Sequence, residues 1–313
     1  MVTHDNPGHG TLSRRLRADR APGSRQRGVF VGLSLTPIMA IFLAFSAAPI
    51  IAVIGYSFFR YSFSVPNHNF NGLTYYKNLF ADSLFWRGLT NTLYFTILAV
   101  PLNILVSLPA ALGLNSVLRA RGFLRACYFL PTIVSAPAVA LLGVALFDSS
   151  TGLVNQVLGA VHLPQPHWLS DSATATPALV ILTVWQDLGY NTILFLAGLQ
   201  AIPRDFYEAA RIDGAGRFAL LRRITLPLLK RTSSFTVVLT VISYLQSFTL
   251  QKVMLNGGPD DSTQVLSLYI YNNAVVIQPS LLSQAMSAAV VLLGVVMAIT
   301  LIQLRLSRVQ WDY

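Results

Sequence analysis

Charged residues are scarce in this sequence. Asp, Glu, Lys and Arg make up 11% of the 313 residues, whereas 54% of the residues are hydrophobic. A soluble domain carries about a quarter charged residues, so this chain has too few to cover a water-exposed surface. The composition excludes an ordinary soluble protein and favours a protein with several membrane spans.

Residues for redox, metal and phosphate chemistry are also sparse. Cys127 is the single cysteine, which excludes a disulfide within the chain. The five histidines lie outside the apolar segments and have no Cys or His partner at metal-binding spacing, so we expect no metal site. The phosphate-binding pattern G-x-x-x-x-G-K-S/T is absent. We therefore expect no ATP-binding site in this chain, so that any ATP is bound by another protein. We also expect no catalytic residue in this chain.

Six apolar segments have the length of a membrane span. About 20 apolar residues cross the hydrocarbon core, and a helix is the structure that satisfies their backbone hydrogen bonds in lipid. We predict a basic, disordered tail at 1–28, a membrane domain at 29–306 and a short tail at 307–313. The predicted spans are 29–59, 90–115, 125–147, 176–200, 232–254 and 284–306.

The basic residues are distributed unevenly between the segments that connect these spans. Eighteen of the 22 Lys and Arg lie in four segments, namely 1–28, 116–126, 201–231 and the carboxy-terminal end. The other four lie in 60–89, 148–175 and 252–283. Basic residues collect on the cytoplasmic side of membrane proteins. We therefore predict an all-α protein with six spans and both termini in the cytoplasm.

The loop 201–231 is a basic insert between the fourth and fifth predicted spans. It holds seven Lys and Arg and the only glutamate of the chain, Glu208. Pro203 and the acidic residues after it predict a short helix over 204–212. Glycines follow, and a second helix is predicted over 217–226. Pro227 is predicted to mark a turn into the fifth span, which makes the loop a helix-turn-helix.

Two interpretations of this loop remain open on composition. A basic amphipathic helix can lie on anionic lipid. Alternatively, the face formed by Phe206, Ala209 and Ala210 can seat in a groove of another protein. Lipid-binding helices keep bulky apolar residues on the buried face, whereas this helix presents alanines. The alanine face and the missing ATP-binding pattern favour a protein partner.

The loop resembles the EAA loop of the permease subunits of binding-protein-dependent ABC importers. The matching residues are Glu208-Ala209-Ala210, Asp213-Gly214-Ala215, Ile224 and Leu226-Pro227. The resemblance implies a coupling helix that docks on a cytoplasmic ATP-binding subunit, with Glu208 paired to a basic residue there. The residues implied at this contact are Glu208, Ala209, Ala210, Asp213, Gly214, Ala215, Phe218, Ile224 and Pro227.

Other segments resemble the same family, in its branch for maltose-like sugars and glycerol-phosphate compounds. Gly257-Gly258-Pro259 resembles an outer loop of these permeases, and we regard these three residues as candidates for docking a binding protein. The resemblance covers 29–306. It implies a bacterial inner-membrane location, a second permease subunit, a dimer of ATP-binding subunits that carries ATP and Mg²⁺, and an external solute-binding protein or lipoprotein.

Polar residues inside predicted spans are candidates for the substrate path. Amide, carboxylate and aromatic side chains suit the hydroxyls and apolar faces of a sugar, although hydrogen bonding between helices is the alternative for each residue. Asp187 is the only ionisable side chain well inside a span, and it weakly favours neutral sugars over glycerol phosphates. The candidates are Asn103, Trp185, Gln186, Asp187, Tyr190, Asn191, Ser243, Tyr244, Gln246 and Ser247.

Two other classes of membrane protein compete with an importer permease. A secondary transporter predicts an inverted repeat or several intramembrane charges for ion coupling. A membrane-embedded enzyme predicts paired carboxylates or histidines within the spans. The sequence shows neither pattern beyond Asp187. We therefore expect a non-catalytic subunit that carries a sugar or sugar-like solute across the membrane.

Overall fold

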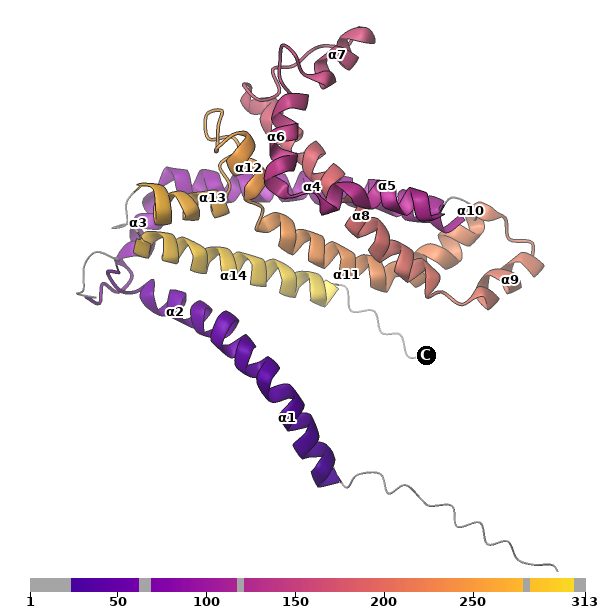
Figure 1. Cartoon of the computed structure of the whole chain (residues 1–313), viewed down its shortest axis with the longest axis horizontal. Coiled ribbons are helices and arrows are strands. Elements are labelled where there is room, and N and C mark those ends of the chain that lie inside the picture. Colours follow the sequence, from indigo (N-terminus) through magenta and orange to yellow (C-terminus); the bar gives the residue numbers. More distant parts are fainter. Residues whose placement is uncertain (1–23, 62–68, 117–120, 278–281, 307–313) are drawn as a thin grey trace, which may run out of the picture. The chain divides into compact units, whose positions relative to one another are not determined.

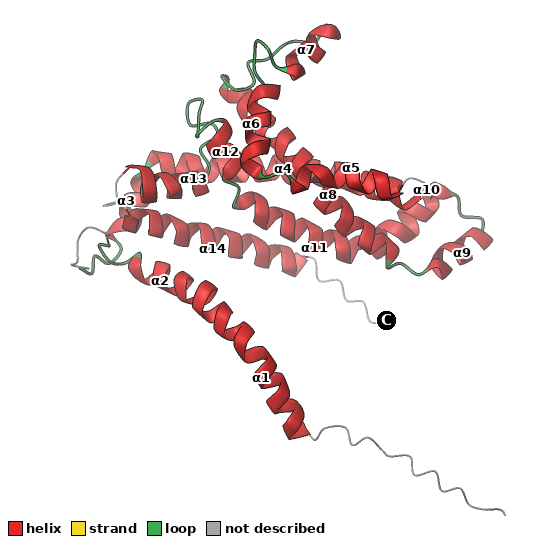
Figure 2. Ribbon diagram, in the orientation of Figure 1, coloured by secondary structure: helices red, strands yellow, loops and turns green. Residues whose placement is uncertain are grey.

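A computed structural model of the chain describes residues 24–61, 69–116, 121–277 and 282–306 (Figure 1). These residues form helices joined by loops (Figure 2). The predicted tail 307–313 and most of the tail 1–28 lie outside them. The chain divides into two compact units, Met1–Ala52 and Val53–Tyr313, and each is described by itself.

The first predicted span, 29–59, corresponds to one continuous helical segment. It consists of α1 (Ser24–Phe42), the π-helical turn η1 (Leu43–Ala47) and α2 (Ala48–Tyr56). Residues 33–56 have a mean hydropathy of 2.5 in their most apolar window. The apolar run is therefore long enough to cross a membrane as a helix.

In the second unit, α4 (Ser83–Ser116), α8 (Ser172–Gln200) and α14 (Leu282–Leu306) are uninterrupted helices of spanning length. The predicted starts of the second and fourth spans, at 90 and 176, are wrong. Asp82 accepts a hydrogen bond from the Leu84 N–H (2.8 Å), and Asp171 accepts one from the Ala173 N–H (3.0 Å). These carboxylates cap the helices before the apolar stretch begins, so hydrophobicity alone places both starts too late.

The third predicted span, 125–147, is bent rather than straight. It consists of α5 (Arg121–Ile133) and α6 (Ala136–Leu146), whose axes differ by 95°. Ser135, the N-cap of α6, has an extended backbone, and Pro137 follows in the first turn of α6, where its missing N–H is tolerated. Among the described residues, five helical segments can cross a membrane, or six when this bent pair counts as one span.

The fifth span continues further toward the coupling loop than the sequence predicts. Helix α11 (Leu226–Leu245) follows α10 (Arg217–Leu220) and the π-helical turn η2 (Leu221–Thr225) without a break. The predicted turn at Pro227 is therefore wrong. Pro227 lies in the first turn of α11, where a missing N–H is tolerated. At its other end α11 stops at Leu245, and α12 (Thr249–Met254) completes the segment.

Five further helices lie outside the apolar runs. Four of them are short helices within predicted outer loops, namely α3 (Thr74–Ala81), α7 (Leu153–Ala160), α13 (Leu266–Tyr271) and η3 (Asn272–Ile277). The fifth, α9 (Arg204–Ile212), has the bounds predicted for the first helix of the loop 201–231. The main apolar core joins α4, α6, α8, α11 and α12. At Gly143 an added Cβ would lie 2.3 Å from Leu182 Cδ2, so α6 packs closely on α8.

Candidate functional site

The loop 201–231 is built on a helix, α9, that ends at a defined turn. The Gly214 N–H donates to the Arg211 carbonyl (3.0 Å) and the Ala215 N–H donates to the Ala210 carbonyl (2.8 Å). Gly214 has a φ of +82°, in the left-handed region that favours glycine. This pair of bonds is the Schellman motif, which satisfies the last carbonyls of a helix. The glycine of the EAA pattern is therefore required by the end of α9.

One hydrogen bond connects α9 to the helix that leads into the membrane. The Tyr207 hydroxyl lies 3.2 Å from Thr225 Oγ1, and the buried Thr225 donates in turn to the Leu220 carbonyl (3.2 Å). The two arms of the loop enclose a cavity of about 370 Å³ whose lining includes Ala210 and Ile224. The loop is thus held as a unit on η2, although α9 itself buries no residue.

The sides of α9 differ in what they face. Glu208 lines a second cavity of about 680 Å³ at the ends of α4 and α8, together with Arg204 and Arg211. Ala210 lines the cavity between the arms, so the structure separates two residues that the sequence places in one motif. Charged groups of both signs line both cavities, but small residues (Ala210, Gly214, Ala215, Gly216 and Ala219) line only the cavity between the arms.

Three apolar side chains of the loop remain uncovered. The exposed fractions are 87% for Ile212, 73% for Phe218 and 45% for Phe206. Ile212 was not among the predicted contact residues, although its position beside the Asp213-Gly214 turn was a usable signal. Of the predicted residues, Ala210, Ala215 and Ile224 are half-buried and the others are exposed. Exposed apolar groups among charges are typical of a surface that binds another protein.

A buried polar network ties together the helices of the predicted path. Asn191 Nδ2 donates to Asn103 Oδ1 (2.5 Å), and Asn103 Nδ2 donates to the Tyr244 hydroxyl (2.9 Å). Thr240 Oγ1 donates to Asn191 Oδ1 (3.3 Å). All four residues are at most 4% exposed. The network therefore connects α4, α8 and α11 through side chains, and Thr240, one helical turn before Tyr244, is the member that the sequence prediction missed.

Asp187 lies at the open end of this network. Asp187, Tyr190 and Ser243 line a small pocket with the network residues, and its volume is about 60 Å³. A pocket of this size holds a few water molecules, not a sugar. The candidates thus gather around one position, but this chain alone does not enclose a substrate.

The remaining path candidates lie apart from this pocket. Trp185 is 40% exposed, and Gln246 is exposed at the break between α11 and α12. Ser247 donates to Gln251 Oε1 (3.0 Å), and Gln186 accepts from Thr132 through its backbone carbonyl (2.9 Å). Gln186 and Ser247 therefore stabilise the helix breaks, whereas the exposed residues remain available to a neighbouring chain or a solute.

The outer loop with Gly257, Gly258 and Pro259 is folded inward. Gly257 is buried with a φ of +92°, and an added Cβ would lie 2.3 Å from Gln264 Oε1. Thr263 donates to the Gly258 carbonyl through its hydroxyl (2.6 Å). The two glycines therefore have an internal role. The docking of a binding protein at Gly257, Gly258 and Pro259 stays a prediction.

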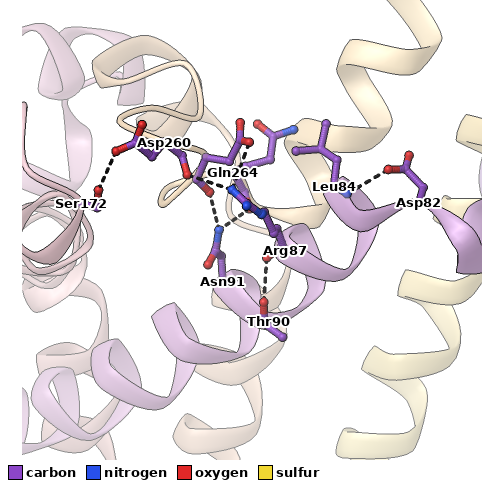
Figure 3. A network of polar contacts seen from close by, with 9 residues as sticks. Asp82, Leu84, Arg87, Thr90, Asn91, Ser172, Asp260 and Gln264 are labelled. Carbon is purple, nitrogen blue, oxygen red and sulfur yellow. Dashed lines mark hydrogen bonds and ion pairs between the residues drawn. The ribbon is translucent and has the colours of Figure 1, made fainter.

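Side chains of α4 and α8 bind this loop through hydrogen bonds and an ion pair (Figure 3). Asn91 Nδ2 donates to the carbonyls of Asp261 (2.7 Å) and Gln264 (3.0 Å). Arg87 forms an ion pair with Asp261 (3.5 Å), and Ser172 donates to Asp260 Oδ2 (3.2 Å). Since Arg87 and Asn91 belong to α4 and Ser172 begins α8, the loop ties the outer ends of two spans together.

Known proteins resemble this chain along most of its length. A family model described as "binding-protein-dependent transport system inner membrane component" matches residues 103–308. The lactose transport system permease protein LacF of Rhizobium radiobacter is 36% identical over 284 residues, which cover 88% of this chain and 93% of the relative. The trehalose/maltose transport system permease protein MalF of Thermococcus litoralis is 35% identical over 240 residues, covering 77% and 81%.

A solved structure has the same fold. A chain of a bacterial alginate ABC transporter, in complex with an alginate pentasaccharide-bound periplasmic protein, superposes with a TM-score of 0.77 at 26% sequence identity. The match covers 90% of this chain and 95% of that chain.

Proposed function

This chain belongs to the family of binding-protein-dependent transport system inner membrane components, and we propose that it acts as one of two permease subunits in a carbohydrate importer. In this proposal it forms half of the translocation path and hydrolyses no ATP itself. Two cytoplasmic ATP-binding subunits carry ATP and Mg²⁺, and an external binding protein delivers the solute. The permeases LacF and MalF, with their lactose and trehalose/maltose systems, support the carbohydrate assignment.

The single observation that carries the proposal is the exposed surface of α9 and α10. The turn at Gly214 supplies hydrogen bonds to the last backbone carbonyls of α9. The side chains of Ile212 and Phe218 are nevertheless 87% and 73% exposed. A folded, rigid surface with uncovered apolar side chains indicates a partner. The charge distribution, with 18 of 22 basic residues on this side, supports a cytoplasmic partner. We propose that this partner is the ATP-binding subunit.

The solute is proposed to pass along the face that carries Asp187, Tyr190 and Ser243. This face is polar within the spans, and its pocket of about 60 Å³ is open on one side. A second permease with a similar face would complete a cavity large enough for a sugar. The carboxylate of Asp187 disfavours a substrate of the same sign, so we propose a neutral sugar or oligosaccharide rather than a glycerol phosphate.

The test is purification of the tagged chain after expression with its candidate partner subunits. We expect the ATP-binding subunit and a second permease to elute with this chain in a fixed ratio. An Ile212→Ser, Phe218→Ser variant should lose the ATP-binding subunit and keep the second permease. The proposal is overturned if the wild-type chain elutes without any ATP-binding subunit, or transports solute without ATP in response to an ion gradient.

A further inference from the structure

A groove of about 280 Å³ lies between the end of α8 and the start of α11. Leu228, Arg231 and Thr232 line it from α11, and their spacings of three and four place them on one face of that helix. Gly198 and Ala201 line it from the end of α8. The groove therefore lies between two helices that are long and apolar enough to cross a membrane.

The two helices meet closely beside this groove. An added Cβ at Gly198 would lie 2.5 Å from Thr232 Oγ1. Phe195, Leu199 and Leu229 belong to one buried apolar cluster that joins the same helices. These contacts fix the spacing of the groove walls, and a preformed site lowers the entropic cost of binding a ligand.

The groove combines an apolar wall with one cation. Ile202, Pro203 and Leu228 contribute apolar side chains, and Arg231 is the only charged residue among the described residues that line the groove. Within the described part of the chain, neither the Arg231 guanidinium nor the Thr232 hydroxyl has a hydrogen-bond or ion-pair partner. A cationic group and a hydroxyl donor are therefore available to a ligand beside an apolar surface.

Arg231 also marks the point where α11 leaves the hydrocarbon. The residues 232–251 contain no Asp, Glu, Lys or Arg, and Lys252 follows them. Since about 20 apolar residues cross the hydrocarbon core, Arg231 is placed at the level of the phospholipid headgroups. Helix α8 ends at Gln200, and Arg204 is the first charged residue after it. The groove thus opens at a membrane surface, where lipid phosphates lie.

We propose that this groove binds the headgroup of an anionic phospholipid from the adjacent leaflet. Arg231 donates paired hydrogen bonds to the phosphate oxygens, Thr232 donates a further one, and the apolar wall contacts the glycerol backbone and the start of an acyl chain. A soluble phosphate would leave the apolar wall uncovered, and a zwitterionic headgroup would bring its own cation close to Arg231.

The site goes beyond the proposed function, because it requires only that α8 and α11 cross a membrane. It is also distinct from the proposed contact with the ATP-binding subunit. That contact lies on α9 and α10, where Ile212 and Phe218 are exposed, whereas the groove lies at the ends of α8 and α11.

The test is native mass spectrometry of the purified full chain, together with the subunits that elute with it, in detergent with added lipid. We expect phosphatidylglycerol to bind with an apparent Kd about tenfold or more below that of phosphatidylcholine, since only the former has a net negative headgroup. Arg231→Gln should raise the Kd for phosphatidylglycerol about tenfold or more. Arg231→Lys keeps the charge without the paired donors, and should lie between these two.

Two matched variants separate charge from shape. Lys230→Gln removes the same charge from the neighbouring exposed position, which does not line the groove, and should bind phosphatidylglycerol as the wild type does. Ala201→Phe fills the groove from an exposed position without changing any charge, and should weaken phosphatidylglycerol binding severalfold.

The proposal is overturned if Arg231→Gln binds phosphatidylglycerol as tightly as the wild type, or if the two lipids bind equally well. Displacement of phosphatidylglycerol by an equal concentration of inorganic phosphate would show a site for soluble anions and would also contradict it. Loss of the ATP-binding subunit from Arg231→Gln would assign Arg231 to a protein contact instead. None of these results decides the proposed function, which depends on ATP-driven uptake.

Discussion

The loop 204–225, predicted to be cytoplasmic, and the loop 256–264, predicted to be outer, flank the same span, and glycines mark both in the sequence. They differ in how much of their surface this chain covers. Helix α9 buries no residue and Ile212 is 87% exposed, whereas Gly257, Thr263 and Gln264 are buried. The outer loop forms its contacts with α4 and α8, and the cytoplasmic loop leaves its apolar side chains without neighbours in this chain.

The difference shows that a sequence motif marks a constrained backbone but does not say which surface is free. Gly214 and Gly257 both have positive φ, yet an added Cβ meets nothing at Gly214 and meets the Gln264 side chain at Gly257. A glycine can therefore be required by a turn that faces solvent or by a turn that faces the protein. Only the former leaves neighbouring side chains for a partner.

The largest effect is expected from reversing the charge of the cytoplasmic loop. Glu208→Lys places a cation where the chain has its only glutamate, so a pairing with a basic residue of the ATP-binding subunit becomes a repulsion. We expect uptake to fall about 30-fold or more, with membrane insertion intact, measured in vesicles matched for protein content. Asp205→Lys, on the same helix but outside the EAA pattern, should retain most transport. Unchanged uptake in Glu208→Lys would remove the coupling assignment.

A glycine exchange in each loop tests the comparison directly. Gly257→Ala introduces backbone strain and a clash with the buried Gln264, and should lower the free energy of unfolding by about 2 to 4 kcal/mol. Gly214→Ala introduces strain alone, and should cost about 1 kcal/mol. Thermal unfolding in detergent measures both. Equal loss of stability in the two variants would show that contacts within this chain constrain the two loops equally, and would contradict the comparison.

The loop 256–264 should depend more on the hydrogen bonds from Asn91 than on its ion pair. Asn91→Ala leaves two backbone carbonyls without their donor, and should cost about 1 to 3 kcal/mol. Arg87→Ala should cost less than about 1 kcal/mol, because Arg87 and Asp261 are largely exposed to solvent. Unfolding at low and high salt distinguishes them, since only the ion-pair contribution falls with salt. A larger loss of stability in Arg87→Ala than in Asn91→Ala would contradict the role assigned to the Asn91 hydrogen bonds.

The smallest effect concerns the turn before α7. Hydrogen bonds from the Thr151 backbone, and then from the Ser150 and Thr151 side chains, hold the pKa of Asp148 well below its usual range. Because the folded pKa is depressed, the carboxylate contributes stability above the ordinary Asp pKa of about 3.9, and this is lost as the pH falls through the folded value. We expect the protection factors for hydrogen exchange of 149–160, which correct for the intrinsic pH dependence of exchange, to be constant between about pH 5 and 8.

Asp148→Ala should raise exchange across this pH range, and Asp148→Asn, which keeps an acceptor oxygen, should raise it less. Equal protection in Asp148→Ala would show that the turn does not depend on the carboxylate.

Much of the fold follows from the sequence because long apolar runs leave helix as the only structure that satisfies the backbone in lipid. The family resemblance drawn from the EAA spacing is confirmed by the match over 103–308. The bounds of α9 were predicted from Pro203, Asp205 and Gly214, which act within a few residues of themselves. Local chemistry of this kind can be read without knowing what packs nearby.

The wrong predictions share a different cause. The 95° bend between α5 and α6 falls at residues 134 and 135, between Pro131 inside α5 and Pro137 in the first turn of α6, within a run that is apolar throughout. The absence of a turn at Pro227 depends on the π-helical register of η2. Hydrophobicity alone marks neither the bend between α5 and α6 nor the continuous helix through Pro227.

ATP-driven uptake by the complete transporter tests the central claim most directly. Purified complex in liposomes that contain ATP and Mg²⁺ would receive radiolabelled sugar together with the solute-binding protein. We predict uptake that requires ATP, Mg²⁺ and the binding protein together, and that Glu208→Lys abolishes while the subunits remain assembled. Uptake that proceeds without ATP or without the binding protein, or that survives Glu208→Lys, would contradict an importer permease coupled through this loop.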